Sequence, residues 1–593
     1  MSPGYVLLAG ERHDDRDALI QPIAERTGLT EAFANHGLVA FVGPSCPCVA
    51  VGNAGCVLGT LFERHGPAEA LSALRPEQAA AIAASEGRSL LASHWGGYVA
   101  AVACDQSSTI LRDPSADFPC YFVETGRFTI FASDAELLVK SGAVDASVDE
   151  EEIGRQLFRA FVPVPGTALR GIQELLAGFA LRISVEGRSL KQCWDPWDHV
   201  EWLDEDRDAA GQALARTIQH SVHAIASAHD RLLVSVSGGL DSSIVASCLA
   251  RAGADAVCLT MFTDDPAGDE RMFARALCDR LGLPLIERPY RLADIDLDQA
   301  MAPNLPRPKD RLQALAFERV NHTVAAEVGA QAFVTGNGGD HVFGYSQSAA
   351  PVADRYLAEG LSSGALASLL DVCRQTGCSI GDALRQAWDL THSSRIYRVR
   401  PNPLFLHPDF VAVLGPKDWH HPWLDAPRGA LPGKAAHVAN ILRVQPNLEP
   451  SLGDRHPVLN PLVSQPVVEA CLRIPSWAWR EHGRDRALVR RAFAGILPPA
   501  ILDRRVKGTP GRFAAQLLDH FRPPIRERLL GGRLAAAGIV DARALDRILA
   551  GERPVPDLER VRILELVNAE AWIGHWRSRP DAGVPSNPPG QIG

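Results

Sequence analysis

A short stretch at residues 235–243, Ser-Val-Ser-Gly-Gly-Leu-Asp-Ser-Ser, follows an apolar run and precedes a helical pattern. Gly238 and Gly239 allow the backbone to approach a ligand closely, with their N–H groups free to point at it. A helix that starts here presents its positive N-terminal end. Ser237, Ser242 and Ser243 add hydroxyl donors. The pattern predicts a polyphosphate cradle. The alternative is a turn that only caps a helix.

Asp241 is the unusual member of this stretch, because a carboxylate beside phosphates is repulsive unless a cation lies between them. Mg²⁺ is the natural bridge. The stretch also lacks the Gly-Lys-Ser/Thr of the P-loop, which suggests that the γ-phosphoryl group is not transferred. A cradle for the β and γ phosphates with Mg²⁺ suits attack at the α-phosphate, with pyrophosphate leaving.

A second glycine-rich cluster, Val-Thr-Gly-Asn-Gly-Gly-Asp-His-Val-Phe-Gly at 334–344, also follows an apolar run. It places Asp340 where that acid could hold Mg²⁺ together with Asp241. An irregular turn is the alternative. Asp269 and Glu270 follow another run and either reach the same edge or cap a helix. Lys507, in Arg-Arg-Val-Lys-Gly, could stabilise negative charge, although its spacing alone fits a solvated surface lysine.

Alternating strands and helices must position these groups. Strands are predicted at 231–237, 255–262, 283–290 and 330–336, and helices from 209, at 241–253, 269–282 and 311–328. Ile244, Val245, Cys248 and Leu249 should form one inward helix face, and Met272, Phe273, Ala276 and Leu277 another. This alternation predicts an α/β fold with a doubly wound parallel sheet, in which ligands bind beyond the carboxyl ends of the strands.

The remainder of the chain differs in character. The first third reads as β-rich, with short apolar runs between turns. The polar segment 194–208 is predicted to be a linker, and the region beyond about residue 350 to be mostly helical. The tail from 577 is rich in Pro and Gly and is expected to be flexible. We therefore expect domains at 1–204 and 205–576, followed by a tail at 577–593.

Composition narrows the functional classes. The chain has 593 residues, of which 46% are hydrophobic and 22% charged, as in a globular enzyme. A net charge of −10 argues against an extended nucleic-acid surface. No apolar stretch approaches the ~20 residues that span a bilayer, and the N-terminus predicts no signal peptide.

The 12 cysteines fit neither a disulfide framework nor a zinc pattern. Cys46 and Cys48 read as a reduced pair rather than a metal or redox site. A cytoplasmic enzyme is expected.

The clusters around Asp241, Asp340 and Lys507 resemble the synthetase half of the glutamine-hydrolysing asparagine synthetase superfamily, whose members activate a carboxylate as an acyl-adenylate and trap it with an amine. Stretches at 110–122, 130–138, 162–183, 193–196, 455–475 and 483–508 extend the resemblance over nearly the whole chain. It implies an Ntn-type αββα sandwich at the N-terminus and a PP-loop ATP pyrophosphatase domain with added helices at the C-terminus.

Two departures from the superfamily pattern concern the N-terminal domain. The family's glutaminases use a Cys after the initiator Met, and this sequence has Ser2. The Arg-Gly-Pro-Asp and Asn-Gly-Glu strings that hold glutamine are also absent. The domain is therefore expected to be inactive as a glutaminase, and the substrate to carry its own amine.

The stretch Thr-Gly-Asn-Gly-Gly-Asp-His-Val-Phe-Gly-Tyr-Ser-Gln-Ser-Ala-Ala-Pro at 335–351 is most similar to the lasso peptide cyclases of Gram-negative bacteria. That resemblance implies adenylation of an Asp or Glu side chain in a precursor core peptide. The new N-terminal amine of the peptide then closes a macrolactam. The implied partners are the precursor peptide, a leader peptidase and a leader-recognition protein, with no nucleic acid and no membrane.

The resemblance also assigns residues. Asp241 and Asp340 would be Mg²⁺ ligands and, with Lys507, catalytic. The ATP-binding residues would be Ser235, Ser237, Gly238, Gly239, Asp241, Ser242, Ser243, Met261, Gly336, Gly338 and Gly339, with 257–261 touching adenine through the backbone. His341 occupies the position where asparagine synthetases have an acid. It would act either as a base for the attacking amine or as a packing residue.

Three other readings stay open. A β-lactam-forming or other small-molecule amide ligase would use the same chemistry on a small amino acid. A non-catalytic scaffold would bind nucleotide or precursor without turnover, although it has no need of Asp241, Asp340 and Lys507 together. Transfer-RNA-modifying enzymes share the loop, but the acidic balance counts against them. The identity of the precursor, the ring size and the oligomeric state are not encoded in any pattern that we find.

Overall fold

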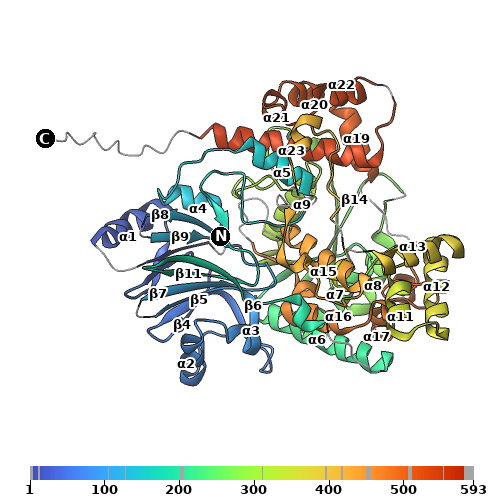
Figure 1. Cartoon of the computed structure of the whole chain (residues 1–593), viewed down its shortest axis with the longest axis horizontal. Helices are drawn as coiled ribbons and strands as arrows, with labels where there is room; N and C mark the ends of the chain where they lie inside the picture. The colour runs from blue at the N-terminus through green and yellow to red at the C-terminus, as the bar shows by residue number, and fades with distance from the viewer. Residues whose placement is uncertain are drawn as a thin grey trace.

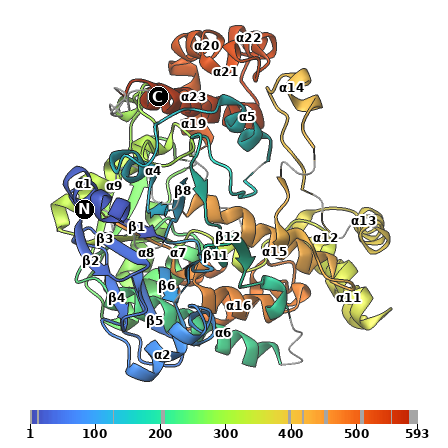
Figure 2. The same cartoon turned by 60° about the vertical axis from the view of Figure 1, so that its left-hand side comes forward.

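The computed structural model describes residues 4–10, 14–104, 106–126, 128–159, 161–200, 206–266, 268–309, 311–393, 397, 399–415, 419–448, 456–504, 511–551 and 553–579. Figures 1 and 2 show a β-rich N-terminal part beside a larger part that is mainly helical. No helix among the described residues is long and apolar enough to cross a membrane.

The N-terminal part contains two six-stranded sheets. One has the order β10 (Gln173–Glu174), β8 (Tyr121–Thr125), β9 (Phe128–Ala132), β1 (Tyr5–Ala9), β3 (Leu38–Val42), β2 (Thr30–Ala34). The other has the order β12 (Gly187–Gln192), β11 (Phe179–Ser184), β7 (Ser107–Arg112), β6 (His94–Cys104), β5 (Gly55–Glu63), β4 (Cys48–Val51). All pairings are antiparallel.

Alternation along β1 explains how its sheet is buried on both faces. Tyr5 and Leu7 share a core cluster with Leu58 and Val99 of the second sheet. Val6 and Leu8 point the opposite way, into a cluster that includes α4 (Ala135–Lys140), α5 (Glu150–Arg159) and α23 (Asp557–Arg577). The predicted sandwich is confirmed, and its outer face is packed against the C-terminal helices.

The C-terminal part is built on a five-stranded parallel sheet with the order β15 (Leu285–Pro289), β14 (Ala256–Phe262), β13 (Leu232–Ser235), β16 (Ala332–Val334), β17 (Val458–Leu459). Helix α7 (Leu240–Ala252) packs on one face, where Val234 meets Ile244. Helix α9 (Ala314–Val328) covers the other, where Leu233 meets Val324. The predicted doubly wound α/β sheet is confirmed.

The helix faces follow the sequence pattern in α7 but not in α8 (Arg271–Leu281). Ile244, Val245, Cys248 and Leu249 are all buried, as predicted, and Gly253 ends α7 with a positive φ of 68°. In α8 the buried residues are Ala274, Leu277 and Cys278, whereas Met272 is 67% exposed. The predicted inward place of Met272 is wrong, because at 3.6 residues per turn Met272 lies on the side of the helix opposite Ala274, Leu277 and Cys278.

The segment predicted to be a linker is partly structured. Its residues 196–199 form a 3-10 turn, and α6 (Arg207–Ser227) begins within it. Trp194 is buried and donates from Nε1 to Glu469 at 3.0 Å, and Trp197 donates to the Trp423 carbonyl at 2.9 Å. The aromatic side chains therefore dock the exit of the N-terminal part on the C-terminal part, so residues 194–199 form an ordered connection.

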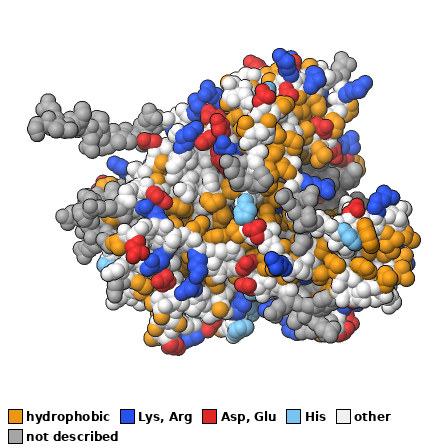
Figure 3. All heavy atoms as spheres, in the orientation of Figure 1, with side chains coloured by type: hydrophobic (Ala, Val, Ile, Leu, Met, Phe, Trp, Pro, Cys, Tyr) orange, Lys and Arg blue, Asp and Glu red, His pale blue; other side chains and the backbone are white. Residues whose placement is uncertain are grey.

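The chain beyond residue 350 is mostly helical, as expected. Its helices include α11 (Ala350–Glu359), α12 (Ser363–Thr376), α13 (Ile380–His392), α15 (Pro432–Val444), α16 (Gln465–Arg473), α17 (Ala487–Ala492), α19 (Gly511–His520), α20 (Arg522–Leu530) and α22 (Ala542–Ala550). The exposed apolar side chains of α12 and α13 include Leu366, Leu384 and Trp388. Apolar surface gathers over these two helices at the right of Figure 3. The predicted tail falls largely outside the described residues, and α23 extends to Arg577.

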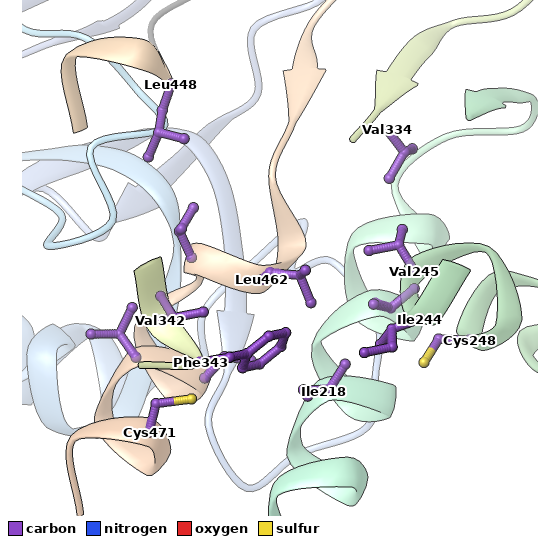
Figure 4. Close-up of a cluster of buried hydrophobic side chains, with 14 of the residues drawn as sticks. Ile218, Ile244, Val245, Cys248, Val334, Val342, Phe343, Leu448, Leu462 and Cys471 are labelled. Atoms are coloured by element: carbon purple, nitrogen blue, oxygen red, sulfur yellow. The ribbon is translucent and has the colours of Figure 1, made fainter. Parts of the chain in front are cut away.

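A buried cluster lies beneath the ends of the central strands (Figure 4). Val342 and Phe343, from the short helix α10 (Gly339–Val342) and the residue after it, point toward Leu462. Ile244 and Val245 of α7 join the same cluster from the other side. This shared core fixes α10 against α7, and with them the two loops that precede these helices.

Candidate active site

The loop after β13 has the conformation that its glycines predict. Gly238 has a φ of +61°, and a Cβ on it would come 2.3 Å from the Cβ of Phe273. Gly239 is the N-cap residue of α7. The Ser242 hydroxyl accepts from the Ser237 N–H at 3.4 Å, which holds the loop at the N-terminus of the helix. The loop thus presents backbone N–H groups and the positive helix end to one region of space.

The loop after β16 packs directly on the first loop. A Cβ on Gly336 would lie 2.5 Å from the Ser242 nitrogen, and one on Gly339 2.4 Å from the Asp241 Cγ. Gly338 has a φ of +82°, and a Cβ there would meet Val463 at 2.2 Å. Gly336 and Gly339 are required by close approach between the two loops, and Gly338 by its approach to Val463. Gly338 and Gly339 do not line the cavity that is described below, so their role is to position the groups that do. Gly336 lines the cavity as well.

Asp241 and Asp340 are brought together by Arg486. The Arg486 Nη1 lies 3.0 Å from both carboxylate oxygens of Asp241 and also donates to Asp340 Oδ1. The Asp241 side chain is 14% exposed and that of Asp340 49%. Two carboxylates that converge on one cationic group form a donor set suited to Mg²⁺, a hard cation that prefers oxygen ligands.

Arg486 is itself held from several sides. Its Nε donates to Asp485 Oδ2 at 2.7 Å, and its guanidinium carbon lies 5.7 Å from the centre of the Tyr345 ring. Burial alone would lower the pKa of Arg486, but Asp241, Asp340 and Asp485 together hold it above its ordinary value. Its backbone φ of +50° is unusual for a non-glycine residue. Arg486 is therefore a fixed positive charge in the site.

A second arginine supports the first loop. Arg504 donates from Nη1 to the carbonyl oxygens of Ser237 at 3.3 Å and Gly238 at 3.1 Å, and it pairs with Glu270. It also lies over the Phe273 ring at 4.2 Å. Glu270 thus reaches the loop through Arg504. Asp269 instead accepts from the Arg271 N–H at 3.0 Å at the start of α8 and pairs with the Arg271 side chain.

These groups border a cavity of about 720 Å³, which we name the nucleotide cavity. Of the residues predicted from the sequence, it is lined by Ser235, Ser237, Gly239, Asp241, Ser242, Met261, Gly336 and Asp340. Arg486, Arg490, Arg504, Thr335 and Tyr345 line it as well. Its size and its mixed glycine, hydroxyl, acid and arginine lining fit a Mg-nucleotide.

Some predicted site residues lie elsewhere. Ser243 is buried and donates to the Gly239 carbonyl at 2.7 Å, so it stabilises the loop and does not line the nucleotide cavity. Within the adenine segment, Val257 and Leu259 are buried in the core and only Met261 lines the cavity. Lys507 and Ser2 fall outside the described residues. The cysteines are all free, and no metal-ligating cluster occurs among the described residues.

Sequence reasoning missed Arg486 and Arg504. Both lie in a stretch rich in arginine, where no spacing distinguishes one guanidinium from its neighbours. His341, singled out from the sequence, does not line the nucleotide cavity but faces a second cavity. Burial lowers the pKa of His341, although the nearby Asp340 acts to raise it. The lowered pKa favours the neutral imidazole.

The fold and the site together define a nucleotide-binding enzyme whose parallel sheet presents a glycine loop and paired acids, joined to an antiparallel sandwich domain. The family model "Asparagine synthase" matches residues 213–574, and the model "Glutamine amidotransferase domain" matches residues 77–194. The chain belongs to the asparagine synthase family. It is an ATP-dependent amide-forming ligase of the asparagine synthetase type.

Two solved structures show weak similarity. One is titled as the allosteric regulatory enzyme of purine biosynthesis, with a TM-score of 0.22 and 10% identity over 56% of this chain and 89% of that one. The other is glutamine phosphoribosylpyrophosphate amidotransferase from B. subtilis in complex with ADP and GMP, with a TM-score of 0.21 and 11% identity over 56% and 90%. No curated protein matches the sequence.

Proposed function

We propose that the protein is an ATP-dependent lasso peptide cyclase that closes a macrolactam in a precursor core peptide. The observation that carries the ligase chemistry is the convergence of Asp241 and Asp340 on Arg486 above the glycine loop. The cyclase subtype is supported by the stretch at 335–351, of which Thr335, Asp340 and Tyr345 line the nucleotide cavity.

The proposed reaction has two steps. First, an oxygen of an Asp or Glu side chain of the peptide attacks the α-phosphorus of ATP, the bond to the bridging oxygen breaks, and pyrophosphate leaves. Second, the N-terminal amine attacks the acyl carbon, the carbon–oxygen bond to AMP breaks, and the amine loses a proton. One amide bond forms, and the peptide loses one water.

The residues of the nucleotide cavity have distinct proposed tasks. The N–H groups around Gly238 and Gly239 and the N-terminus of α7 bind phosphate oxygens. Asp241 and Asp340 would hold Mg²⁺, which when bound neutralises charge on the polyphosphate. Arg486 would pair with a phosphate as the acids engage the metal. Lys507 is proposed, from the resemblance alone, to stabilise developing negative charge.

The N-terminal part, proposed as a domain at residues 1–204, is an inactive glutamine-amidotransferase-like domain, and residues 205–576 form the ligase domain. Ser2 stands where the glutaminases of the family carry their nucleophilic Cys. Glutamine should therefore yield no ammonia with this protein. We propose that a leader peptidase and a leader-recognition protein supply the free amine, and that the site of action is the cytoplasm.

The decisive experiment combines the purified protein, Mg-ATP and a leader-free candidate core peptide, with mass spectrometry and nucleotide chromatography as readouts. A peptide lighter by one water, formed together with AMP and pyrophosphate, is expected. AMP release that depends on a small amino acid in the absence of peptide would replace the cyclase with a small-molecule amide ligase. ADP, or no turnover with any carboxylate, would favour the scaffold reading and contradict the proposal.

A further inference from the structure

A second cavity, of about 350 Å³, adjoins the nucleotide cavity, and we name it the basic chamber. Lys309 and Asn447 line both cavities, so the two are adjacent. The charged residues that line the basic chamber are Arg159, Arg307, Lys309, Arg311, Arg443, Arg562 and Glu565. Among the described lining residues, cationic side chains therefore outnumber anionic ones six to one.

The chamber lies where the two parts of the protein meet. Arg159 ends α5 in the N-terminal part, Arg443 lies in the last turn of α15, and Arg562 is in α23. Figures 1 and 2 both show α5 beside α23. Because these segments are far apart in the sequence, only the association of the two parts creates the chamber.

The walls contain buried guanidinium groups that are incompletely compensated. Arg562 is 2% exposed, donates to the carbonyl oxygens of Leu157 at 2.9 Å and Asn402 at 3.1 Å, and pairs with Glu565 at 3.2 Å. Arg159 is 5% exposed and pairs with Glu152 at 2.7 Å. The Nε atoms of both arginines are buried without a hydrogen-bond partner among the described residues. Unsatisfied buried donors of this kind are costly and mark a place for an acceptor.

Arg112, which is also buried, shows how Arg562 and Arg159 differ from an arginine whose charge is fully compensated. At Arg112 burial opposes the charge, but Glu174 and Asp113 hold the pKa above its ordinary value. At Arg562 and Arg159 burial prevails, and the pKa of each guanidinium is lowered despite Glu565 and Glu152 respectively. Among the described residues, Glu565 and Glu152 therefore do not fully offset the burial of Arg562 and Arg159, and an anionic ligand in the chamber would add negative charge beside these two arginines.

The uncharged lining indicates the kind of anion. Amide side chains of Gln156, Asn402, Asn440, Asn447 and Asn568 contribute to the wall, together with apolar Leu157, Phe161, Val162, Pro163, Pro308 and Pro446. Side-chain amides can pair with peptide N–H and C=O groups, and the apolar surface suits carbon chains. Guanidinium groups bind carboxylates with charge-assisted hydrogen bonds. A peptide-like ligand with a carboxylate fits this wall better than a bare inorganic anion.

We propose that the basic chamber binds a carboxylate of the substrate other than the one that is activated. The inference deepens the proposed ligase function and rests on it. One carboxylate of the substrate reacts in the nucleotide cavity, and a second carboxylate of the same molecule binds in the basic chamber. On a peptide, the second carboxylate is either the C-terminus or another acidic side chain. Anchoring it would hold the reacting group near the glycine loop and select against substrates that have a single acid.

Three defined probes test this. The first is acetyl-Ala-Glu-Ala with two carboxylates, the second its C-terminal amide, and the third acetyl-Ala-Gln-Ala. The acetyl group removes the amine, so no ring can close. Calorimetric titration of the full chain should show the dicarboxylate binding about tenfold or more tightly than either monocarboxylate, the ratio expected when a charge-assisted hydrogen bond is lost.

The matched variants are Arg443→Gln in the chamber, Arg443→Lys to keep the charge, and Arg385→Gln at an exposed site on α13 as a control. Arg443→Gln should abolish the preference of the protein for the dicarboxylate over one of the two monocarboxylates, whereas the other two variants should keep both preferences. The carboxylate whose removal no longer matters in Arg443→Gln is the one that the chamber holds, which separates the two sources.

Several results would overturn the inference. Equal binding of the three probes to the unchanged protein, no binding of any, or uniform weakening by Arg443→Gln would each do so. Inorganic phosphate binding as tightly as the dicarboxylate would show a general anion site instead. The ligase proposal is scored separately by AMP release, so its failure and the failure of the chamber assignment remain distinguishable.

Discussion

Asp241 and Asp340 follow adjacent parallel strands, β13 and β16, and both contact the same nitrogen atom, Nη1 of Arg486. Without a shared cation the two carboxylates would repel each other across the mouth of the nucleotide cavity. The guanidinium therefore occupies a position between the acids that a divalent cation would also favour. Substitution of either acid or of Arg486 should therefore change how the site binds Mg²⁺.

Replacing either acid with its amide should stop nucleotide turnover without unfolding the protein. Asp241→Asn and Asp340→Asn each remove a proposed Mg²⁺ ligand, and we expect AMP release to fall by about 100-fold or more. Circular dichroism should remain unchanged. Asp409→Asn, at an exposed position away from the cavity, is the control. Full activity of Asp241→Asn would refute the proposed metal site.

Arg486→Gln should expose the repulsion between the two acids. In Mg²⁺-free buffer we expect the free energy of unfolding to fall by about 1–3 kcal/mol, the usual cost of losing hydrogen bonds to charged groups. Added Mg²⁺ should recover more of the melting temperature in the variant than in the unchanged protein. The exposed Arg484→Gln serves as the control. An equal effect of Mg²⁺ on both proteins would show that Arg486 and the metal do not share a position.

Gly336→Ala should disturb the contact between the two loops. Its new Cβ would lie 2.5 Å from the Ser242 nitrogen, a backbone atom that cannot move without shifting the start of α7. We expect a loss of about 1–3 kcal/mol in stability and weaker ATP binding, measured by calorimetry. Gly574→Ala, in α23 with nothing within 4 Å of the added carbon, should be neutral or slightly stabilising. Unchanged ATP affinity in Gly336→Ala would contradict the loop packing.

His437 should make stability depend on pH. Burial lowers its pKa to about 3, from an ordinary value of 6.5. Between these values the unfolded chain binds the proton and the native protein does not, so stability falls as the pH is lowered from about 6.5 toward 3. The slope from one such group approaches 1.4 kcal/mol per pH unit at about 25 °C.

The matching variant is His437→Gln, which keeps a donor for the Val342 carbonyl that His437 Nε2 contacts at 2.8 Å. Its free energy of unfolding, followed by denaturant titration at several pH values, should change less steeply across this range. His392→Gln, at an exposed residue, should leave the slope unchanged. An identical slope in His437→Gln and the unchanged protein would refute the assignment.

Lys507→Ala is predicted to lower AMP release while leaving the fold intact. Lys507 lies outside the described residues, so this prediction rests on the resemblance of its stretch to the family and not on a contact. Steady-state assays at saturating ATP would measure the loss, and the conservative variant Lys507→Arg should retain part of the activity. A fully active Lys507→Ala would remove this lysine from the proposed mechanism.

Much of the site could be predicted from the sequence because its determinants are local. A buried strand, two glycines and a helix start fix the loop at 237–243 within a few residues, and the same holds for 335–340. The parallel sheet followed from the alternation of apolar strands and amphipathic helices, although the two-residue edge strand β17 is too short to leave a pattern. Met272 was predicted to face inward but is exposed, because the face of α8 that becomes buried is set by the elements that pack against it.

The sequence by itself determined the glycine loop, the two acids and the family, since these depend on residue types at short, fixed spacings. Only the tertiary structure decided that Arg486, 245 positions from Asp241, would join the two acids. It also decided that Arg159, Arg443 and Arg562 would line one basic chamber beside the nucleotide cavity. The physical reason is that a charged side chain interacts with the groups that lie near it in space. Which groups lie near it is set by how whole helices and strands pack together and not by the neighbouring residues in the sequence.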